Sequence, residues 1–251
     1  MIAYDYPLTE QIRTFLRLKH LFQRAFYWLE QNAAQDHHGA LLTLFEIIDV
    51  TARADVKSDL LQCLDRQRVA LAPLRGNVNV LQEPLEKTLS DLETAAYDLH
   101  ASKGKFGEHL RNHEWLMSIK QRTGIPGGMC DFDLPGYHYW LSRAPGQRRQ
   151  HMQDWLAPLL PTYHGLKVHL SLLQDSGRAL QLEACQGLYQ QAKVGPEVRL
   201  LRVLLEEDQP CVPEISANKY LLNIRFMEAG EAMRPGVFAA NLDFTLILCT
   251  L

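Results

Sequence analysis

Acidic and histidine side chains in the middle of the chain could support acid-base chemistry or hold a cation. Asp131 and Asp133 flank one phenylalanine just after a Gly-Gly turn, and His138 follows them. A carboxylate and an imidazole placed together can transfer protons or bind a metal ion. His109 and His113 are four residues apart on a predicted helix, a spacing that can bring two imidazoles to one metal. One hypothesis is therefore an enzyme that acts on a small molecule or uses a metal ion.

The sequence lacks the motifs that would accompany such chemistry. It contains no phosphate-binding loop, no dinucleotide-binding G-x-G-x-x-G, no G-x-S-x-G nucleophile elbow and no H-E-x-x-H zinc motif. No further metal ligand is indicated near the two histidines, and a pair of aspartates before a helix more often caps that helix. These absences weigh against the enzyme hypothesis and against a metal site, and the enzyme using Asp131, Asp133 and His138 is kept as the alternative.

The cysteines favour buried thiols over disulfides or zinc. Their number, five, is odd, their positions are far apart, and no C-x-x-C occurs. With 47% hydrophobic and 22% charged residues among 251, the composition is that of a globular protein with a sizeable core. The cysteines are Cys63, Cys130, Cys185, Cys211 and Cys249.

The sequence also argues against membranes and nucleic acids as partners. The longest stretch without a charge, residues 155–166, contains two prolines and is shorter than the roughly 18 apolar residues that cross a bilayer. The N-terminus has neither the basic region nor the apolar run of a secretory signal, so we expect a cytoplasmic protein. The net charge of −3 does not favour phosphate backbones, which attract strongly basic surfaces.

Apolar residues recur every three or four positions from residue 8 to about residue 174, which predicts amphipathic helices. Pro158 and Pro161 predict a kink or a split in the last of them, because proline lacks the backbone N–H that a helix uses. Short links favour antiparallel neighbours. The expected helices cover about residues 9–32, 36–53, 55–71, 81–99, 105–123 and 147–174.

Beyond Gly177 the period changes to two, the pattern of half-buried strands. Short links predict an antiparallel sheet. The fold class is therefore α+β, with an N-terminal helical bundle domain at residues 1–177 and a C-terminal antiparallel β domain at residues 178–251. Met129–Asp133 is a candidate additional strand of the β domain. The expected strands cover residues 219–226 and 238–246, with weaker candidates at 178–191 and 197–206.

A row of cationic side chains is the most informative feature of the first predicted helix. The spacing between successive members is four, three and four positions, so their side chains lie on one side of the helix. The row is either a solvated face with acids nearby or a surface for an acidic partner, because guanidinium groups pair with carboxylates. The members are Arg13, Arg17, His20 and Arg24.

Four blocks of residues, taken in their order and spacing, point to a known family. The blocks are Pro7-Leu8-x-Glu10-x-x-Arg13-Thr14-x-Leu16-Arg17, Leu64-Asp65-Arg66-Gln67, Ile125-Pro126-Gly127-Gly128 with Phe132-Asp133-Leu134-Pro135-x-x-His138-x-Trp140-Leu141, and Ile224-Arg225-Phe226-Met227. Together they resemble the ZapD family of bacterial cell division proteins across nearly the whole chain. The resemblance implies a cytoplasmic homodimer at the mid-cell division site that binds the tubulin-like protein FtsZ.

The resemblance also implies how FtsZ would be bound. The dimer would recognise the C-terminal tail of FtsZ, a mostly disordered segment with acidic and apolar residues, and would crosslink and bundle FtsZ filaments to stabilise the Z-ring. Neither catalysis nor a cofactor is implied, and we expect neither nucleic-acid binding nor membrane insertion. Arg17, His138 and Arg225 stand at matching positions and are the leading predicted contacts of the tail. Weaker candidates near matched blocks or helix ends are Arg53, Lys57, Arg111, Lys120, Arg122 and Lys219.

Overall fold

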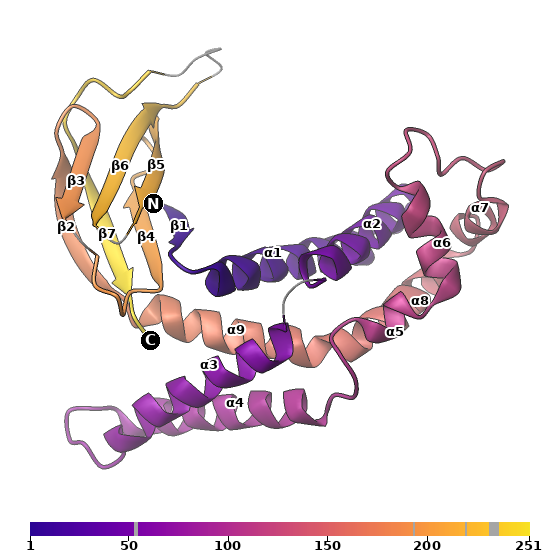
Figure 1. The fold of residues 1–251 in the computed structure, drawn as a ribbon, viewed down its shortest axis with the longest axis horizontal. Helices are drawn as coiled ribbons and strands as arrows, with labels where there is room; N and C mark the ends of the chain where they lie inside the picture. The colour runs from indigo at the N-terminus through magenta and orange to yellow at the C-terminus, as the bar shows by residue number, and fades with distance from the viewer. Residues whose placement is uncertain (53–54, 193, 219, 231–235) are drawn as a thin grey trace. The chain divides into compact units, whose positions relative to one another are not determined.

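The chain folds as an α+β protein, as the change of period predicts (Figure 1). A computed structural model describes residues 1–52, 55–192, 194–218, 220–230 and 236–251. Two compact units are formed: residues 1–13 with 170–251, called the β unit, and residues 14–169, called the helical unit. Residues 1–13, which the predicted boundaries place in the helical domain, are grouped with the β unit.

The helices begin and end where local chemistry requires. They are α1 (Glu10–Glu30), α2 (Ala34–Val50), α3 (Val56–Leu71), η1 (Ala72–Leu74), α4 (Gln82–Ala101), α5 (Glu108–Arg111), α6 (Glu114–Arg122), α7 (Pro135–Leu141), α8 (Pro145–Leu156), η2 (Ala157–Leu159) and α9 (Leu160–Asp175). The hydroxyl of Thr9 accepts the backbone N–H of Ile12 at 3.3 Å and so caps the start of α1. The last predicted helix is split at its prolines into α8, η2 and α9, as expected.

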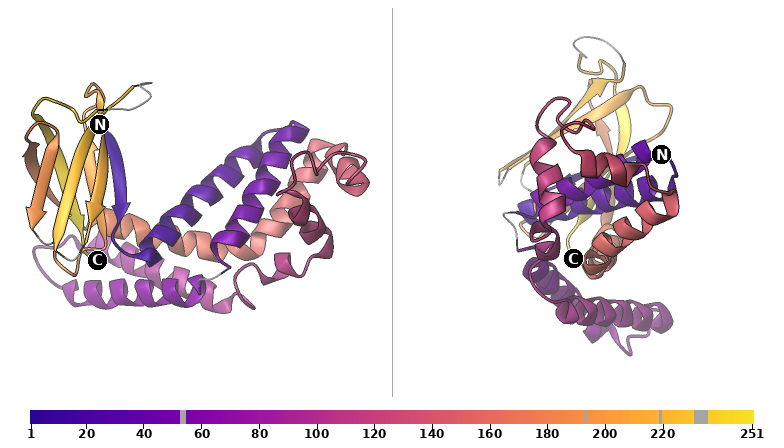
Figure 2. Two further views of the ribbon diagram at one scale, coloured as in Figure 1. Left: turned by 45° about the horizontal axis from the view of Figure 1, so that its top comes forward. Right: turned by 90° about the vertical axis from the view of Figure 1, so that its right-hand side faces the viewer.

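The core of the helical unit follows the predicted apolar stripes. Phe15 and Phe22 of α1 are fully buried. α3 and α4 lie side by side in every view (Figures 1 and 2) and bury leucines such as Leu64 and Leu89. The predicted stripe of α4 begins too early, because Leu81 precedes the helix and 78% of it is exposed. None of the described helices is both long enough and apolar enough to cross a membrane.

The segment predicted as one helix over residues 105–123 forms two short helices, α5 and α6. The break falls at His113, whose ring Nδ1 accepts the backbone N–H of Leu116 at 3.4 Å and so caps α6. Met129–Asp133, the candidate extra strand, forms turns instead. α7 follows directly and is not among the helices expected from the apolar period.

A buried arginine ties the beginning of α8 to the link between α1 and α2. Only 4% of Arg148 is exposed. Its Nε donates to Nδ1 of His37 at 2.9 Å, and its terminal nitrogens donate to the carbonyls of Asn32 at 2.7 Å, Leu141 at 2.9 Å and Arg143. Burial and the Arg148 charge lower the pKa of His37, so that its ring stays neutral and can accept this bond. A buried cation is thus held by neutral acceptors.

The β unit is a sandwich of two antiparallel sheets. Its strands are β1 (Ile2–Pro7), β2 (Arg178–Ala184), β3 (Leu188–Ala192), β4 (Leu200–Leu205), β5 (Cys211–Ala217), β6 (Leu221–Glu228) and β7 (Leu242–Cys249). One sheet has the order β1-β4-β7-β2 and the other the order β3-β6-β5. Inward side chains from both sheets form one core, where the rings of Phe226 and Phe244 lie 5.0 Å apart.

Several strands differ from the expectation. β1 comes from the N-terminus and pairs with β4, with Ile2 opposite Leu205. The segment 178–191, expected as one strand, folds into β2 and β3, because Gln186 and Gly187 form a tight turn with φ values of 50° and 70°. β5 contains Pro213 and therefore occupies an edge of its sheet. The last strand, expected over 238–246, runs over Leu242–Cys249.

A buried histidine makes the stability of the helical unit depend on pH. His169 is 2% exposed, its ring packs edge-on against Phe15 at 5.6 Å, and its ring nitrogens have no hydrogen-bond partner among the described residues. Burial, helped by the charge of Arg66, lowers the pKa of His169 from 6.5 to about 4.

Below pH 6.5 the unfolded chain binds a proton at His169 that the folded chain does not bind, so stability is lost as the pH falls. We expect a loss of about 3 kcal/mol between pH 7.5 and pH 4 from this group. Urea unfolding of the wild type and of His169→Leu at several pH values measures it. Equal pH dependence of the two proteins would contradict the prediction.

Candidate functional site

The predicted tail contacts fall in different parts of the structure. Arg225 belongs to the β unit. Arg53 and Lys219 lie outside the described residues. The helical unit contains the other six, which are Arg17, Lys57, Arg111, Lys120, Arg122 and His138.

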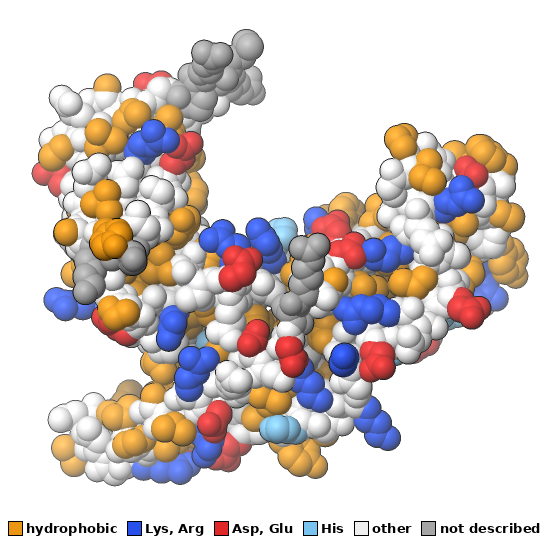
Figure 3. Space-filling view, in the orientation of Figure 1, with side chains coloured by type: hydrophobic (Ala, Val, Ile, Leu, Met, Phe, Trp, Pro, Cys, Tyr) orange, Lys and Arg blue, Asp and Glu red, His pale blue; other side chains and the backbone are white. Residues whose placement is uncertain are grey.

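The cationic row of α1 is only partly neutralised. Nε of Arg13 lies 3.2 Å from the Glu10 carboxylate, and a terminal nitrogen of Arg24 lies 2.5 Å from Glu46 of α2. Arg17 and His20 are exposed and make no hydrogen bond or ion pair within the described residues. The face of the protein in Figure 3 shows basic and acidic side chains intermixed over the helices.

The side chains of Lys57 and Arg111 donate hydrogen bonds to backbone carbonyl groups of the helical unit. Nζ of Lys57 donates to the carbonyl of Ser102 at 2.6 Å. The guanidinium of Arg111 donates to the carbonyl of Phe106 at 2.6 Å and to the hydroxyl of Thr51 at 3.2 Å. Both side chains therefore have structural contacts that an incoming carboxylate would have to replace.

Lys120 and Arg122 of α6 have acidic neighbours, whereas His138 has none among the described residues. Lys120 lies 2.7 Å from Asp49, and Arg122 lies 3.7 Å from Asp133, which is a loose contact. His138 is exposed on α7. Asp133 thus pairs with an arginine instead of capping α7, whose N-cap is Leu134.

The structure gives no support to a metal centre at the acidic and histidine residues. The described residues contain no group of three or more His, Cys, Asp or Glu side chains that could hold an ion. His113 caps α6, and Nε2 of His109 lies 2.9 Å from the carbonyl of Trp155. The carboxylate of Asp131 accepts the backbone N–H of the next residue, Phe132, at 3.0 Å.

Two of the cysteines also depart from expectation. Cys63, Cys211 and Cys249 are buried as predicted, whereas Cys130 and Cys185 are exposed, and none of the five forms a disulfide among the described residues.

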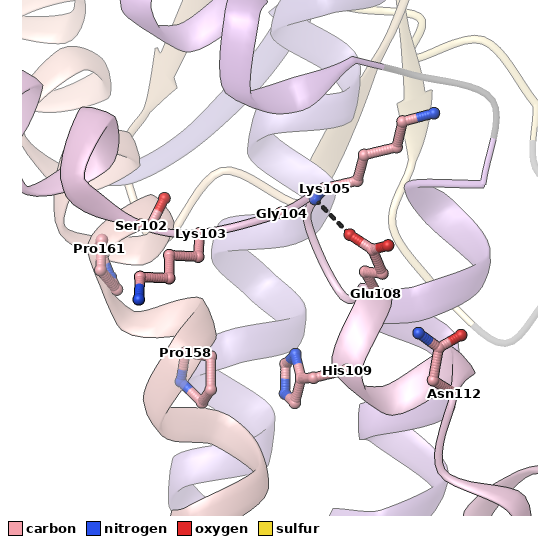
Figure 4. A pocket seen from close by; sticks show the side chains of 9 residues that line it. All are labelled: Ser102, Lys103, Gly104, Lys105, Glu108, His109, Asn112, Pro158 and Pro161. Carbon is pink, nitrogen blue, oxygen red and sulfur yellow. Dashed lines mark hydrogen bonds between the residues drawn. The ribbon is translucent and has the colours of Figure 1, made fainter.

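A pocket of about 490 Å³ lies between the α4–α5 connection and the start of α9 (Figure 4). Lys103 reaches over it toward Pro158 and Pro161, and no acidic partner of Lys103 occurs among the described residues. His109 also lines this pocket, and its Nε2 is hydrogen-bonded to the backbone carbonyl of Trp155. A carbonyl oxygen can only accept a hydrogen bond, so Nε2 carries the proton and Nδ1 is the unprotonated nitrogen of the neutral ring. The predicted Lys57 borders this pocket through its bond to Ser102. Sequence reasoning missed Lys103, since it lies in a loop outside every matched block.

A second pocket, called the α2–α7 pocket, has a volume of about 450 Å³. At its wall the Tyr137 hydroxyl and Nδ1 of His38 lie 2.7 Å apart. Burial raises the pKa of Tyr137 and lowers that of His38, so both groups are neutral near pH 7. It is lined by Gln35, His38, Leu42, Thr123, Ile125, Pro126, Gly127, Gly128, Met129, Cys130, Tyr137 and Leu141.

In the β unit, Arg225 already has an acidic neighbour. Arg225 of β6 stands opposite Glu214 of β5 in the sheet, and the two side chains form an ion pair at 2.8 Å. Both are about half exposed, so this pair contributes little to stability and leaves the guanidinium accessible.

These features define an α+β protein with a helical unit, a β-sandwich and exposed cations that an acidic partner could pair with. Residues 16–225 match the family model of ZapD, which is described as a cell division protein. The chain therefore belongs to the ZapD family, and its role lies in cell division.

Full-length relatives agree with this assignment. The chain is 47% identical to a cell division protein ZapD of Chromobacterium violaceum, over 99% of both chains. It is 46% identical to one of an Azoarcus species over 100% of both, and 45% identical to one of Nitrosomonas europaea over 100% of this chain and 96% of that protein.

Proposed function

We propose that this protein binds the C-terminal tail of FtsZ and that its homodimer crosslinks and bundles FtsZ filaments at the mid-cell Z-ring, without catalysing a reaction. The observation that carries the proposal is Arg17, an exposed arginine without an acidic partner in the described structure, in a chain of the ZapD family. A guanidinium left free in this way can form paired, charge-assisted hydrogen bonds to a carboxylate of an acidic tail.

A dimer would turn weak tail binding into crosslinking. A two-fold axis duplicates every site, so a homodimer presents two tail sites that can hold two filaments. Repeated contacts along the filaments then add through effective concentration, and each contact can stay weak.

Exposed apolar side chains on the helical unit support self-association. Val78 and Leu81, in the link before α4, are 96% and 78% exposed, and Val69 of α3 and Tyr97 of α4 are also exposed. Exposed apolar side chains such as these can be covered by a second copy of the chain.

The test is sedimentation of FtsZ filaments with this protein at increasing salt. Tail recognition by exposed cations should weaken as the screening length falls to about 8 Å near physiological ionic strength. We expect abundant pelleted bundles at low salt and several-fold fewer above physiological salt. Bundling that does not change with salt would contradict the proposal, and filaments alone are the control.

A further inference from the structure

Three tryptophans from three different helices form one cluster in the helical unit, called the tryptophan cluster. They are Trp115 of α6, Trp140 of α7 and Trp155 of α8, and the ring centroids of the three pairs lie 5.8, 6.0 and 6.1 Å apart. The three helices lie together at one end of the helical unit (Figures 1 and 2) and have only nine, seven and twelve residues. Helices this short are marginal alone, so their packing against one another stabilises them.

Two histidines hold this end together as hydrogen-bond acceptors. Nε1 of Trp140 donates to Nδ1 of His151 of α8 at 3.1 Å. Nδ1 of His113 accepts the backbone N–H of Leu116 at 3.4 Å and so caps α6. An indole N–H and a backbone N–H can only donate, so both Nδ1 atoms carry no proton in this arrangement. Both imidazole rings also contact Trp155, with centroid distances of 5.9 and 6.0 Å.

The two histidines are half-buried, so a proton can reach them while the helices are folded. A third histidine at the same end, His37, accepts a hydrogen bond from Arg148 in the same way but is fully buried. Burial and the Arg148 charge lower the pKa of His37, so its ring stays neutral. His113 and His151 are therefore the acceptors that a fall in pH can remove.

Neither ring has a charged partner that would compensate for a proton. Neither His113 nor His151 forms an ion pair within the part of the chain that the structure describes. The ionisable groups on the helices around them are engaged elsewhere or exposed, and they are His109 of α5, Glu114 of α6, Tyr137 and His138 of α7, and Arg148 and Asp154 of α8. A proton on either ring therefore costs one hydrogen bond and gains no ion pair.

We propose that the tryptophan cluster is a pH-sensitive contact: below about pH 6.5, protonation of His113 and His151 opens the first turn of α6 and the contact between α7 and α8. A protonated imidazole has two N–H donors and no acceptor, so the closed arrangement excludes a proton at both Nδ1 atoms. The open arrangement binds more protons, and the closed one is therefore lost as the pH falls. The opening would also displace predicted tail contacts on α6 and α7, and only this consequence rests on the proposed function.

Hydrogen exchange of the wild-type protein, followed by mass spectrometry at pH 7.5 and pH 5.5, measures the opening without FtsZ. One pH unit below the ordinary imidazole pKa, each histidine should favour opening about tenfold, and the two together up to about a hundredfold. Peptides of α6 and α7 should therefore lose at least tenfold in protection, after correction for the intrinsic exchange rate at each pH. Peptides of α3 should keep theirs, and they control for the stability of the helical unit as a whole, His169 included.

A pair of substitutions assigns the opening to these two rings. Asparagine at both positions, His113→Asn with His151→Asn, places an amide oxygen near each Nδ1 site and does not titrate. Near-ultraviolet circular dichroism reports fixed aromatic packing, and the cluster holds three of the four tryptophans. The wild-type signal should fall between pH 7.5 and pH 5.5, and that of the double variant should stay constant. His100→Asn, at an exposed histidine of α4, is the matched control and should behave as the wild type does.

The wild-type exchange experiment decides the proposal even where the double variant does not fold. Equal corrected protection of α6 at both pH values overturns it, and so does a loss in α3 that matches the loss in α6, which is general acid unfolding. A folded double variant whose signal still falls as the wild type's does overturns the assignment to His113 and His151. Loss confined to α6 and α7, absent from the double variant and present in His100→Asn, supports it.

Discussion

Replacement of Arg17 by glutamate should weaken binding of the FtsZ tail peptide by roughly ten- to hundredfold. The substitution removes a cation that has no other partner in the described structure and puts a like charge beside the acidic peptide. In filament bundling the loss should be larger, because each dimer would lose both sites at once. The affinity is measured by fluorescence anisotropy of the labelled peptide at low salt.

A matched variant controls for the change in net charge. Lys87→Glu alters the charge equally at an exposed position of α4 and should bind the peptide as the wild type does. Arg225→Glu should have a smaller effect than Arg17→Glu, since Arg225 already shares its charge with Glu214. Equal affinities for wild type and Arg17→Glu would remove Arg17 from the site.

Replacement of Arg148 by methionine should lower the free energy of unfolding by about 3 kcal/mol. The substitution keeps much of the side-chain volume and removes all donors of the guanidinium. The carbonyls of Asn32 and Leu141 and the ring nitrogen of His37 would then lose their partner in a buried place. Urea denaturation followed by circular dichroism measures the loss.

Arg75 offers the control for this prediction. It forms a two-pronged ion pair with Glu86 at 2.8 and 3.0 Å, but both side chains are about half exposed. Arg75→Met should therefore lower the stability much less than Arg148→Met does. A similar small cost for Arg148→Met would show that the buried arginine does not hold α8 to the neighbouring link.

Elements with a strong period could be predicted, because periodicity records burial directly. The stripe of α1, with Phe15 and Phe22, and the alternation of Leu222, Ile224 and Phe226 in β6 are both buried as expected. These patterns depend only on which side of a helix or strand faces the core, and the local sequence determines that side.

Elements that depend on distant residues could not be predicted. β1 is a strand because it pairs with β4, about two hundred residues away, and its own six residues carry only a weak pattern. The break between α5 and α6 depends on one ring nitrogen of His113. Neither the pairing of β1 with β4 nor the cap at His113 produces a periodic pattern in the sequence.

The same reasoning explains what the sequence could say about the site. The spacing of Arg17 and its neighbours predicts a common face, but the acid opposite Arg24 comes from α2 and is visible only in the fold. Likewise, the spacing of the Ile-Pro-Gly-Gly block predicts a turn, and only the fold brings α2 and α7 to it. Which cations remain unpaired is a tertiary property.

The most direct test is a titration of a labelled FtsZ tail peptide into the purified protein at low and at physiological salt, with the protein's mass measured in solution. The account predicts saturable binding to a dimer, with affinity that falls as salt rises. No saturable binding at any salt, or binding by a monomer with no salt dependence, would contradict it.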